Sequence, residues 1–315
     1  MILLLGARKK YESIATYLEN SNETFFAVEA EKDQANSSDK IKTTFVGYDN
    51  FFNENFYKNK HVTKIVNLRD QRNWLGIENK ISTRKNLPQK FNEITLDFFS
   101  YKSVQNNLAK DLDIPVLDIG NKKIIVKLDS GYSGGDGFRV IERKEYVPTT
   151  NNFLQRYIEI DYTLAVQAVA DKEGNIFPYC FHKIKYDNNS PKYCESPYFD
   201  IETKQITGYL KKLKTKLEIK DRLIFWQFIK EKNGFLYNLD FNCRPAGGFE
   251  TGTFDRLIGD FNVLDFYLGH NKMPDAITFS NQVQLTYKYN YQFGYGPFDK
   301  KIIKKNKFKY EVIQI

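Results

Sequence analysis

The chain has 315 residues, and its hydrophobic content of 41% and charged content of 27% are those of an ordinary soluble globular protein. No apolar run approaches the roughly 20 residues that cross a bilayer, and the opening apolar run, residues 1–6, is too short for a signal peptide. The three cysteines lack metal-binding spacing, and their odd number argues against a disulfide framework. We therefore expect a cytoplasmic protein of two or three α/β lobes that makes no membrane contact.

The net charge of +8 raises the question of nucleic-acid binding. Two lysine clusters contribute to this charge: Lys211, Lys212, Lys214 and Lys216, and then Lys300, Lys301, Lys304, Lys305, Lys307 and Lys309. Neither cluster carries a recognised nucleic-acid motif, and a lysine-rich composition spread over solvated faces explains the charge more simply. A basic nucleic-acid-binding module is accordingly the least favoured function.

The first part of the chain, residues 1–97, alternates short apolar runs with polar or helical stretches. Strand-like runs occupy residues 1–5, 25–28, 44–46 and 62–66, and residues 11–18 are helix-like. This alternation predicts an N-terminal domain built on an open, largely parallel α/β sheet. The turn at Gly6 is not a dinucleotide-binding fingerprint, because no G-x-G-x-x-G pattern follows it.

The rest of the chain predicts α+β structure, which we divide into residues 98–180 and residues 181–315. In the first division we expect a helix at 102–112 and strands at 124–128, 138–141, 153–158 and 162–170. In the second we expect helices near 207–218 and 254–268, strands at 223–229 and 235–241, and a strand-like aromatic tail at 282–315. The dipeptide Asn233-Gly234 between two apolar runs is a strong hairpin signal.

A glycine-rich segment directly follows the strand expected at 124–128. Lys127 stands near the end of that strand, and the glycines that follow are Gly131, Gly134, Gly135 and Gly137. Glycines let backbone N–H groups converge on phosphate oxygens without Cβ clashes, and the lysine can place its ammonium group against the same phosphates. The segment is not a P-loop, because the lysine precedes the glycines. A hairpin tip without a ligand is the alternative interpretation.

A second motif ends the hairpin, where residues 236–248 read Leu-Tyr-Asn-Leu-Asp-Phe-Asn-Cys-Arg-Pro-Ala-Gly-Gly. Because alternate residues of a strand share a face, Asp240, Asn242 and Arg244 point the same way. A carboxylate and an amide oxygen suit Mg²⁺, and an arginine can neutralise an anion beside them. Gln227 on the partner strand can lie near Asp240 across the hairpin and supply a further oxygen. An exposed polar strand face is the alternative interpretation.

A third feature is the polar turn between the strands expected at 153–158 and 162–170. It contains Gln155, Arg156, Tyr157, Ile158 and Asp161. Such a hinge can offer backbone groups to an adenine and a carboxylate to ribose hydroxyls. A charged β-turn without a ligand explains these residues equally well.

In this order and spacing, these features resemble the ATP-grasp superfamily of carboxylate–amine or carboxylate–thiol ligases over residues 98–270. The lysine strand with its glycine loop carries the resemblance, together with residues 239–248, which are similar to the family's E-x-N-x-R-x-x-G pattern. The resemblance implies an N-terminal α/β domain followed by the two-lobed ATP-grasp fold. It also implies ATP bound between the two lobes with one or two Mg²⁺ ions, for which Mn²⁺ can substitute.

The resemblance further assigns roles to particular residues. ATP would be bound by Lys102, Lys127, Ser133, Gly134, Gly135, Gly137, Gln155, Arg156, Tyr157, Ile158 and Asp161. The magnesium ligands would be Gln227, Asp240 and Asn242, and the catalytic residues would be Arg244 and Lys127. The chain departs from the family pattern in three places. Gln227 replaces a more usual acid, Asp240 replaces the usual glutamate, and Asp136 adds a negative charge to the phosphate loop.

The function that follows from the resemblance is ATP-dependent ligation of a small-molecule carboxylate to an amine through an acyl phosphate. A phosphotransferase on the same fold and a non-catalytic nucleotide-binding protein remain open alternatives. His182, Lys183 and Lys185 lie on a strand that can meet an anionic substrate, although a packed side chain is the favoured reading of the histidine. The aromatic tail either covers a lobe or forms a subunit interface, as in a homodimer.

Overall fold

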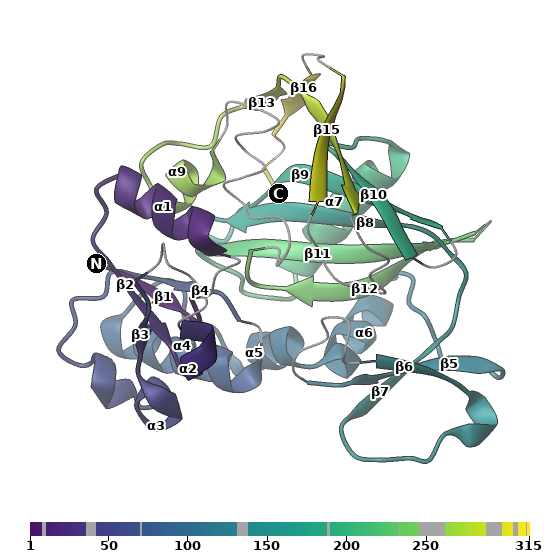
Figure 1. Ribbon diagram of the computed structural model, residues 1–315, viewed down its shortest axis with the longest axis horizontal. Coiled ribbons are helices and arrows are strands. Elements are labelled where there is room, and N and C mark those ends of the chain that lie inside the picture. The colour runs from purple at the N-terminus through teal and green to yellow at the C-terminus, as the bar shows by residue number, and fades with distance from the viewer. Residues whose placement is uncertain are drawn as a thin grey trace.

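The computed structural model describes residues 1–7, 11–35, 42–69, 71–130, 138–187, 190–232, 234–245, 262–287, 298–304, 308–312 and 314–315. Three larger sheets organise this part of the chain, with a two-stranded ribbon of β13 (Ala276–Phe279) and β16 (Phe308–Glu311) beside them. Figure 1 shows the N-terminal domain at the lower left and a three-stranded sheet at the lower right, both below a large sheet that crosses the molecule.

The N-terminal domain contains a parallel sheet in the order β3-β2-β1-β4. Its strands are β1 (Ile2–Leu5), β2 (Phe25–Glu29), β3 (Thr44–Phe45) and β4 (Lys64–Asn67). Its helices are α1 (Glu12–Asn20), α2 (Lys32–Ala35), α3 (Gly47–Phe51) and α4 (Arg72–Lys85), with a 3₁₀ turn at Glu54–Tyr57. β1 is apolar throughout because both of its faces are covered: Ile2 and Leu4 join one core cluster, and Leu3 and Leu5 join another.

The three-stranded sheet is antiparallel in the order β6-β5-β7. Its strands are β5 (Lys123–Leu128), β6 (Phe138–Glu142) and β7 (Asn152–Arg156), with a 3₁₀ turn at Arg143–Glu145. Two helices precede it, α5 (Glu93–Ser100) and α6 (Lys102–Asp111). The side chain of Asn92 accepts a hydrogen bond from the Thr95 amide and so caps the start of α5.

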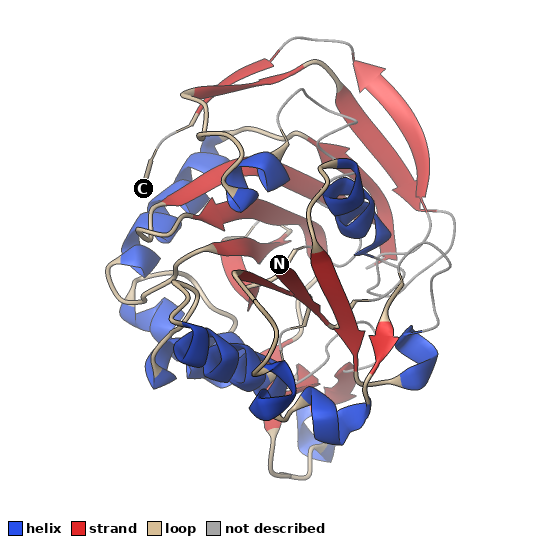
Figure 2. Ribbon diagram, turned by 90° about the vertical axis from the view of Figure 1, so that its left-hand side faces the viewer, coloured by secondary structure: helices blue, strands red, loops and turns tan. Residues whose placement is uncertain are grey.

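The large sheet has the order β12-β11-β8-β9-β10-β14-β15, and its neighbouring strands are antiparallel. Its strands are β8 (Ile160–Ala170), β9 (Ile176–Asp187), β10 (Ser190–Ser196), β11 (Arg222–Glu231), β12 (Leu236–Asn242), β14 (Gln282–Tyr287) and β15 (Phe298–Lys304). The accompanying helices are α7 (Ile201–Lys214) and α9 (Val263–Leu268). Figure 2 shows helices along the left and lower borders of the molecule and further helices beside the strands in its upper part.

The two faces of the large sheet belong to different cores. Because side chains alternate along a strand, Ala165 and Val169 of β8 pack with α1, α9 and the N-terminal sheet, whereas Leu164 and Val166 pack with α5, α6 and α7. Gln227 pairs with Ala165, so the predicted metal face of β11 lies on the side that meets the N-terminal domain.

These observations confirm the predicted mixture of a parallel α/β sheet with antiparallel α+β lobes, and they shift several element boundaries. α7 begins six residues before the helix expected at 207–218, because the Asp200 side chain caps it through the amides of Glu202 and Thr203. β10 and the helices α4 and α5 were not predicted. Of the helix expected at 254–268, the structure describes the last turns as α9.

The proposed division into residues 1–97, 98–180 and 181–315 stays a prediction. Residue 97 lies within α5 and residue 180 lies within β9, whereas the change from the three-stranded to the large sheet occurs between Arg156 and Ile160. Within the described ranges, no helix is both long and apolar enough to cross a membrane.

Candidate active site

Two predicted phosphate-binding lysines converge with the predicted metal-binding aspartate. Lys102 opens α6, Lys127 lies in β5, and Asp240 lies in β12. The Nζ atom of Lys102 is 3.7 Å from Oδ1 of Asp240. Burial lowers the pKa of Lys127 to about 8, with the charge of Lys102 acting in the same direction and that of Asp240 opposing it. Two ammonium groups beside one carboxylate leave an excess of positive charge, which suits a polyphosphate.

Asp129 holds the two lysine-bearing elements together through its carbonyl and carboxylate groups. Its carbonyl oxygen accepts from the Lys102 amide at 2.9 Å, and its own amide donates to the Asn151 carbonyl at 2.9 Å. Its carboxylate accepts from the amide and the hydroxyl of Ser103, both at 2.7 Å. Because Asp129 follows Lys127 by two residues, these bonds hold the end of β5 against the start of α6. Sequence reasoning missed this residue, which reads as one more polar residue of the glycine segment.

The predicted metal ligands share one face of the β11–β12 hairpin. Gln227 and Asp240 are directly paired across the two strands, and a bulge follows Gln227. Nδ2 of Asn242 donates to Oδ2 of Asp240 at 3.2 Å, and Asn242 is buried. One carboxylate and two amide oxygens fit the hard-oxygen preference of Mg²⁺, whose remaining ligands are commonly phosphate oxygens and water. Among the described residues, no cluster of three or more His, Cys, Asp or Glu residues forms a metal site.

The remaining catalytic prediction, Arg244, follows the end of β12. Its Nη1 atom donates to the Pro245 carbonyl at 3.1 Å. Arg244 thus lies two residues beyond Asn242, at the point where the described part of the hairpin ends. Ser133, Gly134, Gly135 and Gly137 lie outside the described residues.

At the predicted hinge, the side chain of Arg156 connects two sheets. Its Nη1 and Nη2 atoms donate to the two carboxylate oxygens of Glu231, each at 2.8 Å, and Nη2 also reaches the Tyr237 hydroxyl at 2.8 Å. The hydrogen bonds from Arg156 hold the pKa of Glu231 below its ordinary value. β7 is thereby joined to β11 and β12, so the guanidinium group has a structural partner of its own.

The main chain of the hinge is partly engaged as well. The amide of Arg156 donates to the Asp118 carbonyl at 2.9 Å, and the amide of Tyr157 donates to the Lys123 carbonyl at 3.1 Å. Gln155 is buried in β7. A hollow of about 430 Å³ beside the hinge is lined by Gly120, Asn121, Lys122, Lys123, Glu142, Arg156 and Tyr157.

An apolar cluster underlies the hinge, and the sequence reasoning named one of its members. Ile158 packs with Leu117, Ile160, Ile229 and Tyr237, which come from both sides of the junction between sheets. Such a surface can hold one face of a flat aromatic base. Asp161 forms a 2.7 Å ion pair with Lys185 of β9.

His182 is a packed side chain, as favoured from the sequence. It is fully buried, its Nε2 atom lies 2.6 Å from Nε2 of Gln167, and burial lowers its pKa to about 3. The neighbouring Lys183 donates to the Tyr198 hydroxyl at 2.6 Å. The buried His182 therefore does not face a substrate, and Lys183 is engaged with Tyr198.

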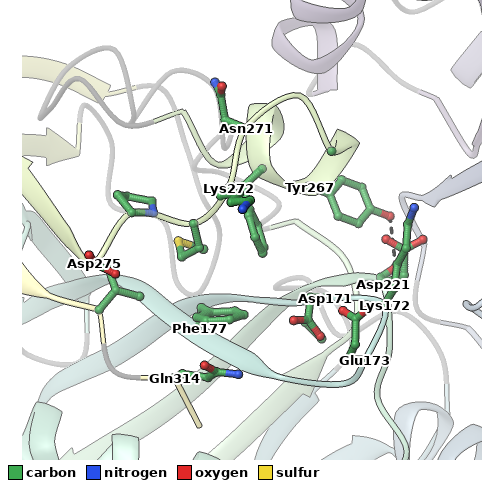
Figure 3. A pocket seen from close by; sticks show the side chains of 16 residues that line it. Asp171, Lys172, Glu173, Phe177, Asp221, Tyr267, Asn271, Lys272, Asp275 and Gln314 are labelled. Atoms are coloured by element: carbon green, nitrogen blue, oxygen red, sulfur yellow. Dashed lines mark hydrogen bonds between the residues drawn. The ribbon is translucent and has the colours of Figure 1, made fainter.

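A separate pocket of about 490 Å³ lies at the far ends of β8 and β11 from the hinge (Figure 3). Phe177 and Met273 line it together with the charged side chains of Asp171, Glu173 and Lys272. It contains none of the predicted nucleotide or metal ligands, so the convergence of Lys102, Lys127 and Asp240 remains the candidate active site.

No family model matches the chain, and no curated protein sequence matches it. Solved structures do match its fold. N5-carboxyaminoimidazole synthetase from Staphylococcus aureus complexed with ADP superposes with a TM-score of 0.73 at 13% identity, covering 91% of this chain and 81% of that chain. Biotin carboxylase from Campylobacter jejuni, as a β-γ-ATP complex, superposes with a TM-score of 0.65 at 15% identity, covering 91% and 75%.

A third match is the biotin carboxylase domain of 2-oxoglutarate carboxylase from Hydrogenobacter thermophilus, with a TM-score of 0.67 at 13% identity over 91% of this chain and 74% of that one. These proteins belong to the ATP-grasp superfamily. The agreement in fold extends over nearly the whole chain, and the order of sheets is the one that the sequence resemblance implies. The chain therefore has the ATP-grasp fold.

Proposed function

We propose that the chain is an ATP-dependent ligase that joins a small-molecule carboxylate to an amine. The observation that carries this proposal is the convergence of Lys102 and Lys127 with Asp240, on the strand face that also presents Gln227 and Asn242. Positive charge for a triphosphate and oxygen ligands for a divalent cation thus meet where the three-stranded and large sheets face each other. The ATP-grasp fold is consistent with this arrangement.

In the first step, an oxygen of the substrate carboxylate attacks the γ-phosphorus of ATP. The bond from that phosphorus to the β–γ bridging oxygen breaks, which gives an acyl phosphate and ADP. Lys102 and Lys127 neutralise the phosphate oxygens throughout the step. Gln227, Asp240 and Asn242 would hold Mg²⁺, which supplies further charge neutralisation when bound.

In the second step, the amine nitrogen attacks the acyl carbon and forms the amide bond. Phosphate leaves with the electron pair of the acyl C–O bond, and the amine loses its proton to solvent. Arg244, two residues beyond Asn242, is proposed to contact the phosphoryl group that is transferred. The main contribution of the protein in both steps is positioning and charge neutralisation.

The adenosine part of ATP is proposed to lie at the hinge, on the apolar cluster that contains Ile158. Gln155, Tyr157 and Ile158 remain candidates to contact the base, and Asp161 remains a candidate for the ribose hydroxyls. Arg156 is proposed to contribute through its carbonyl group, since its guanidinium group is bound to Glu231 and Tyr237 and its amide to Asp118. Ser133, Gly134, Gly135 and Gly137 are proposed to bind phosphate oxygens.

The test is a screen for ADP release against amino acids and small carboxylates, with mass detection of the products. Bicarbonate belongs in the panel, because one structural neighbour was solved with MgADP and a bicarbonate anion. ADP together with an amide product supports the proposal. A phosphorylated acceptor without an amide would identify a phosphotransferase, and ATP binding without ADP release would identify a non-catalytic nucleotide-binding protein.

We further propose that the protein acts in the cytoplasm and assembles as a homodimer. One structural neighbour is described as a domain dimer, and the sequence of the C-terminal part of this chain is rich in aromatic residues. Light scattering coupled to size-exclusion chromatography measures the mass in solution, and a monomer at all concentrations contradicts the dimer.

A further inference from the structure

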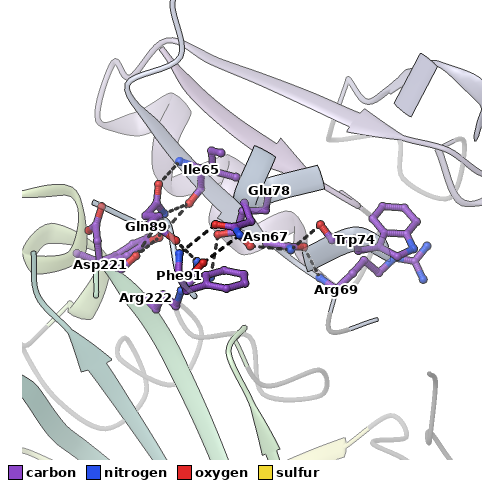
Figure 4. Close-up of polar contacts among 11 residues, drawn as sticks. Ile65, Asn67, Arg69, Trp74, Glu78, Gln89, Phe91, Asp221 and Arg222 are labelled. Carbon is purple, nitrogen blue, oxygen red and sulfur yellow. Dashed lines mark hydrogen bonds and ion pairs between the residues drawn. The ribbon is translucent and has the colours of Figure 1, made fainter. Parts of the chain in front are cut away.

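Two successive residues at the start of β11 insert their side chains into the N-terminal domain (Figure 4). Nη1 of Arg222 lies 2.8 Å from Oε1 of Glu78 on α4, and the two side chains are 3% and 1% exposed. Asp221 forms a second buried ion pair, with Lys64 of β4. Two buried ion pairs therefore hold the large sheet to the N-terminal domain. The N-terminal domain supplies the anion of one pair and the cation of the other.

The Arg222–Glu78 pair continues to the carboxyl end of the parallel sheet. Oε2 of Glu78 accepts from Nδ2 of Asn67 at 2.9 Å, and Oδ1 of Asn67 accepts from the Arg69 amide at 3.0 Å. Asn67 is the last residue of β4. In open α/β sheets, ligands bind outside the carboxyl ends of the strands, so this edge of the N-terminal domain is where a substrate can be held.

On its other side, Arg222 lies beneath the segment that carries Arg244. A small cavity is lined jointly by Asn67, Glu78, Arg222, Cys243 and Pro245. Asn242 pairs with Phe225, three residues along β11 from Arg222, so the chain beyond Asn242 passes over the guanidinium group. The ring of Phe91, 4.5 Å from the guanidinium carbon, supports the group from the N-terminal domain.

We propose that Glu78 and Arg222 are positioning residues that hold residues 243–245 against the carboxyl edge of the N-terminal sheet, where the amine acceptor binds. The inference rests on the proposed ligase function. The second step requires the amine nitrogen to lie close to the acyl carbon, so a small displacement of the N-terminal domain slows amide formation. The residues proposed to bind the phosphates and the cation are Lys102, Lys127, Gln227, Asp240 and Asn242. None of the contacts described for Glu78 and Arg222 involves them, so ATP binding and cleavage are expected to change less than amide formation. Any effect through Arg244 would lower ADP release as well.

The test compares two isosteric variants, Glu78→Gln and the matched control Asp221→Asn. Both break a buried ion pair between the same two parts of the molecule, and both are expected to lower stability. Using the carboxylate and amine that the ADP screen identifies, Glu78→Gln should raise the ratio of ADP to amide about tenfold, while the Kd for ATP changes less than about twofold. Asp221→Asn should keep the wild-type ratio. An unchanged ratio in Glu78→Gln, or an equal rise in both variants, overturns the inference.

A second measurement does not depend on the substrates. Hydrogen exchange followed by mass spectrometry should show faster exchange in Glu78→Gln for peptides that cover 65–69 and 238–245. Asp221→Asn should leave the 238–245 peptide unchanged. Unaltered exchange of that peptide in Glu78→Gln rejects the positioning role even if ligation is confirmed. Absence of any amide in the wild type, with the exchange result as expected, rejects the ligase function and leaves the positioning role standing.

Discussion

Gln227 and Asp240 lie directly opposite each other on β11 and β12, and the side-chain Nδ2 of Asn242 donates to the same aspartate. Lys102 approaches that aspartate from α6. One carboxylate is thus shared between a cluster of oxygen ligands and a lysine that can bind phosphate. Under the proposed function, Asp240 is therefore the residue on which nucleotide and cation binding both depend.

Replacing Asp240 by Asn should lower kcat for ADP release by about 100-fold or more at saturating magnesium, because the only carboxylate of the proposed cation site loses its charge. ADP release is followed by a coupled spectrophotometric assay. Asp118→Asn is the control, since Asp118 pairs with Lys110 at the surface with its side chain 70% exposed. Full activity of Asp240→Asn in the presence of magnesium contradicts the metal assignment.

The affinity for ATP should fall as the pH rises through the pKa of Lys127, which burial lowers to about 8. Below that pH the amine is charged and attracts the phosphates, and above it the charge is lost. We expect the Kd for ATP to rise about tenfold between pH 7 and pH 9. Lys127→Arg keeps its charge in this range, so titration calorimetry should show a flat profile for it. The same slope in both proteins would exclude Lys127 as its source.

Asp129→Ala should raise the KM for ATP, because it releases the hydrogen bonds that hold the start of α6 to the end of β5. The loss of these hydrogen bonds to the first turn of α6 should also lower the free energy of unfolding by about 1 kcal/mol. Asn92→Ala removes the cap of the neighbouring helix α5 and serves as the matched control. Urea unfolding should show similar losses for the two variants, with the KM changed only in Asp129→Ala.

The Arg156–Glu231 pair should contribute about 1 kcal/mol to stability, a modest value because both side chains are partly solvated. Since Arg156 lowers the pKa of Glu231, this contribution is present above the unfolded pKa of the carboxyl and disappears as the pH falls through its folded pKa. A double-mutant cycle with Arg156→Gln and Glu231→Gln, measured at pH 7 and then at successively lower pH, checks the value. A coupling energy that does not decline as the pH falls below the ordinary pKa of a glutamate contradicts this account.

Replacing two glycines of the N-terminal domain by alanine should change the stability of the protein in opposite directions. Gly6 has a φ of +78°, and an added Cβ would lie 2.6 Å from Cγ of Arg69, so Gly6→Ala should destabilise by more than about 1 kcal/mol. Gly76 lies within α4 with open space at its Cβ position, so Gly76→Ala should stabilise by about 0.5–1 kcal/mol. Thermal unfolding of both variants tests the pair.

Local patterns predicted the features that depend on neighbouring residues. The Asn-Gly signal predicted the hairpin of β11 and β12, and a bulge after Gln227 brings Asp240 opposite it. The apolar spacing of residues 102–112 predicted α6, and the run of residues 1–5 predicted a fully buried strand. Periodicity and turn chemistry act over a few residues, and these elements needed nothing more.

Features that depend on distant partners were not predictable in this way. The family resemblance assigned Arg156 to the nucleotide, and nothing close to it in the sequence indicated that its side chain pairs with Glu231, 75 residues away. Glu78 and Lys64 carry charges, which in a sequence indicate the surface, yet both are buried against ion-pair partners from β11 and its approach. α4 was missed for a related reason, because its buried face includes Glu78 and Ser82 among the apolar residues.

The two buried ion pairs also govern the order in which the chain can fold. Synthesis releases the N-terminal domain first, and Asp221 follows Lys64 by 157 residues. Until β11 has been made, the ion-pair partners that the described structure gives Lys64 and Glu78 do not exist, and burying either charge without its partner is costly. Completion of the N-terminal domain is therefore coupled to completion of the large sheet, and a nascent chain that stops before β11 presents an open, protease-sensitive intermediate.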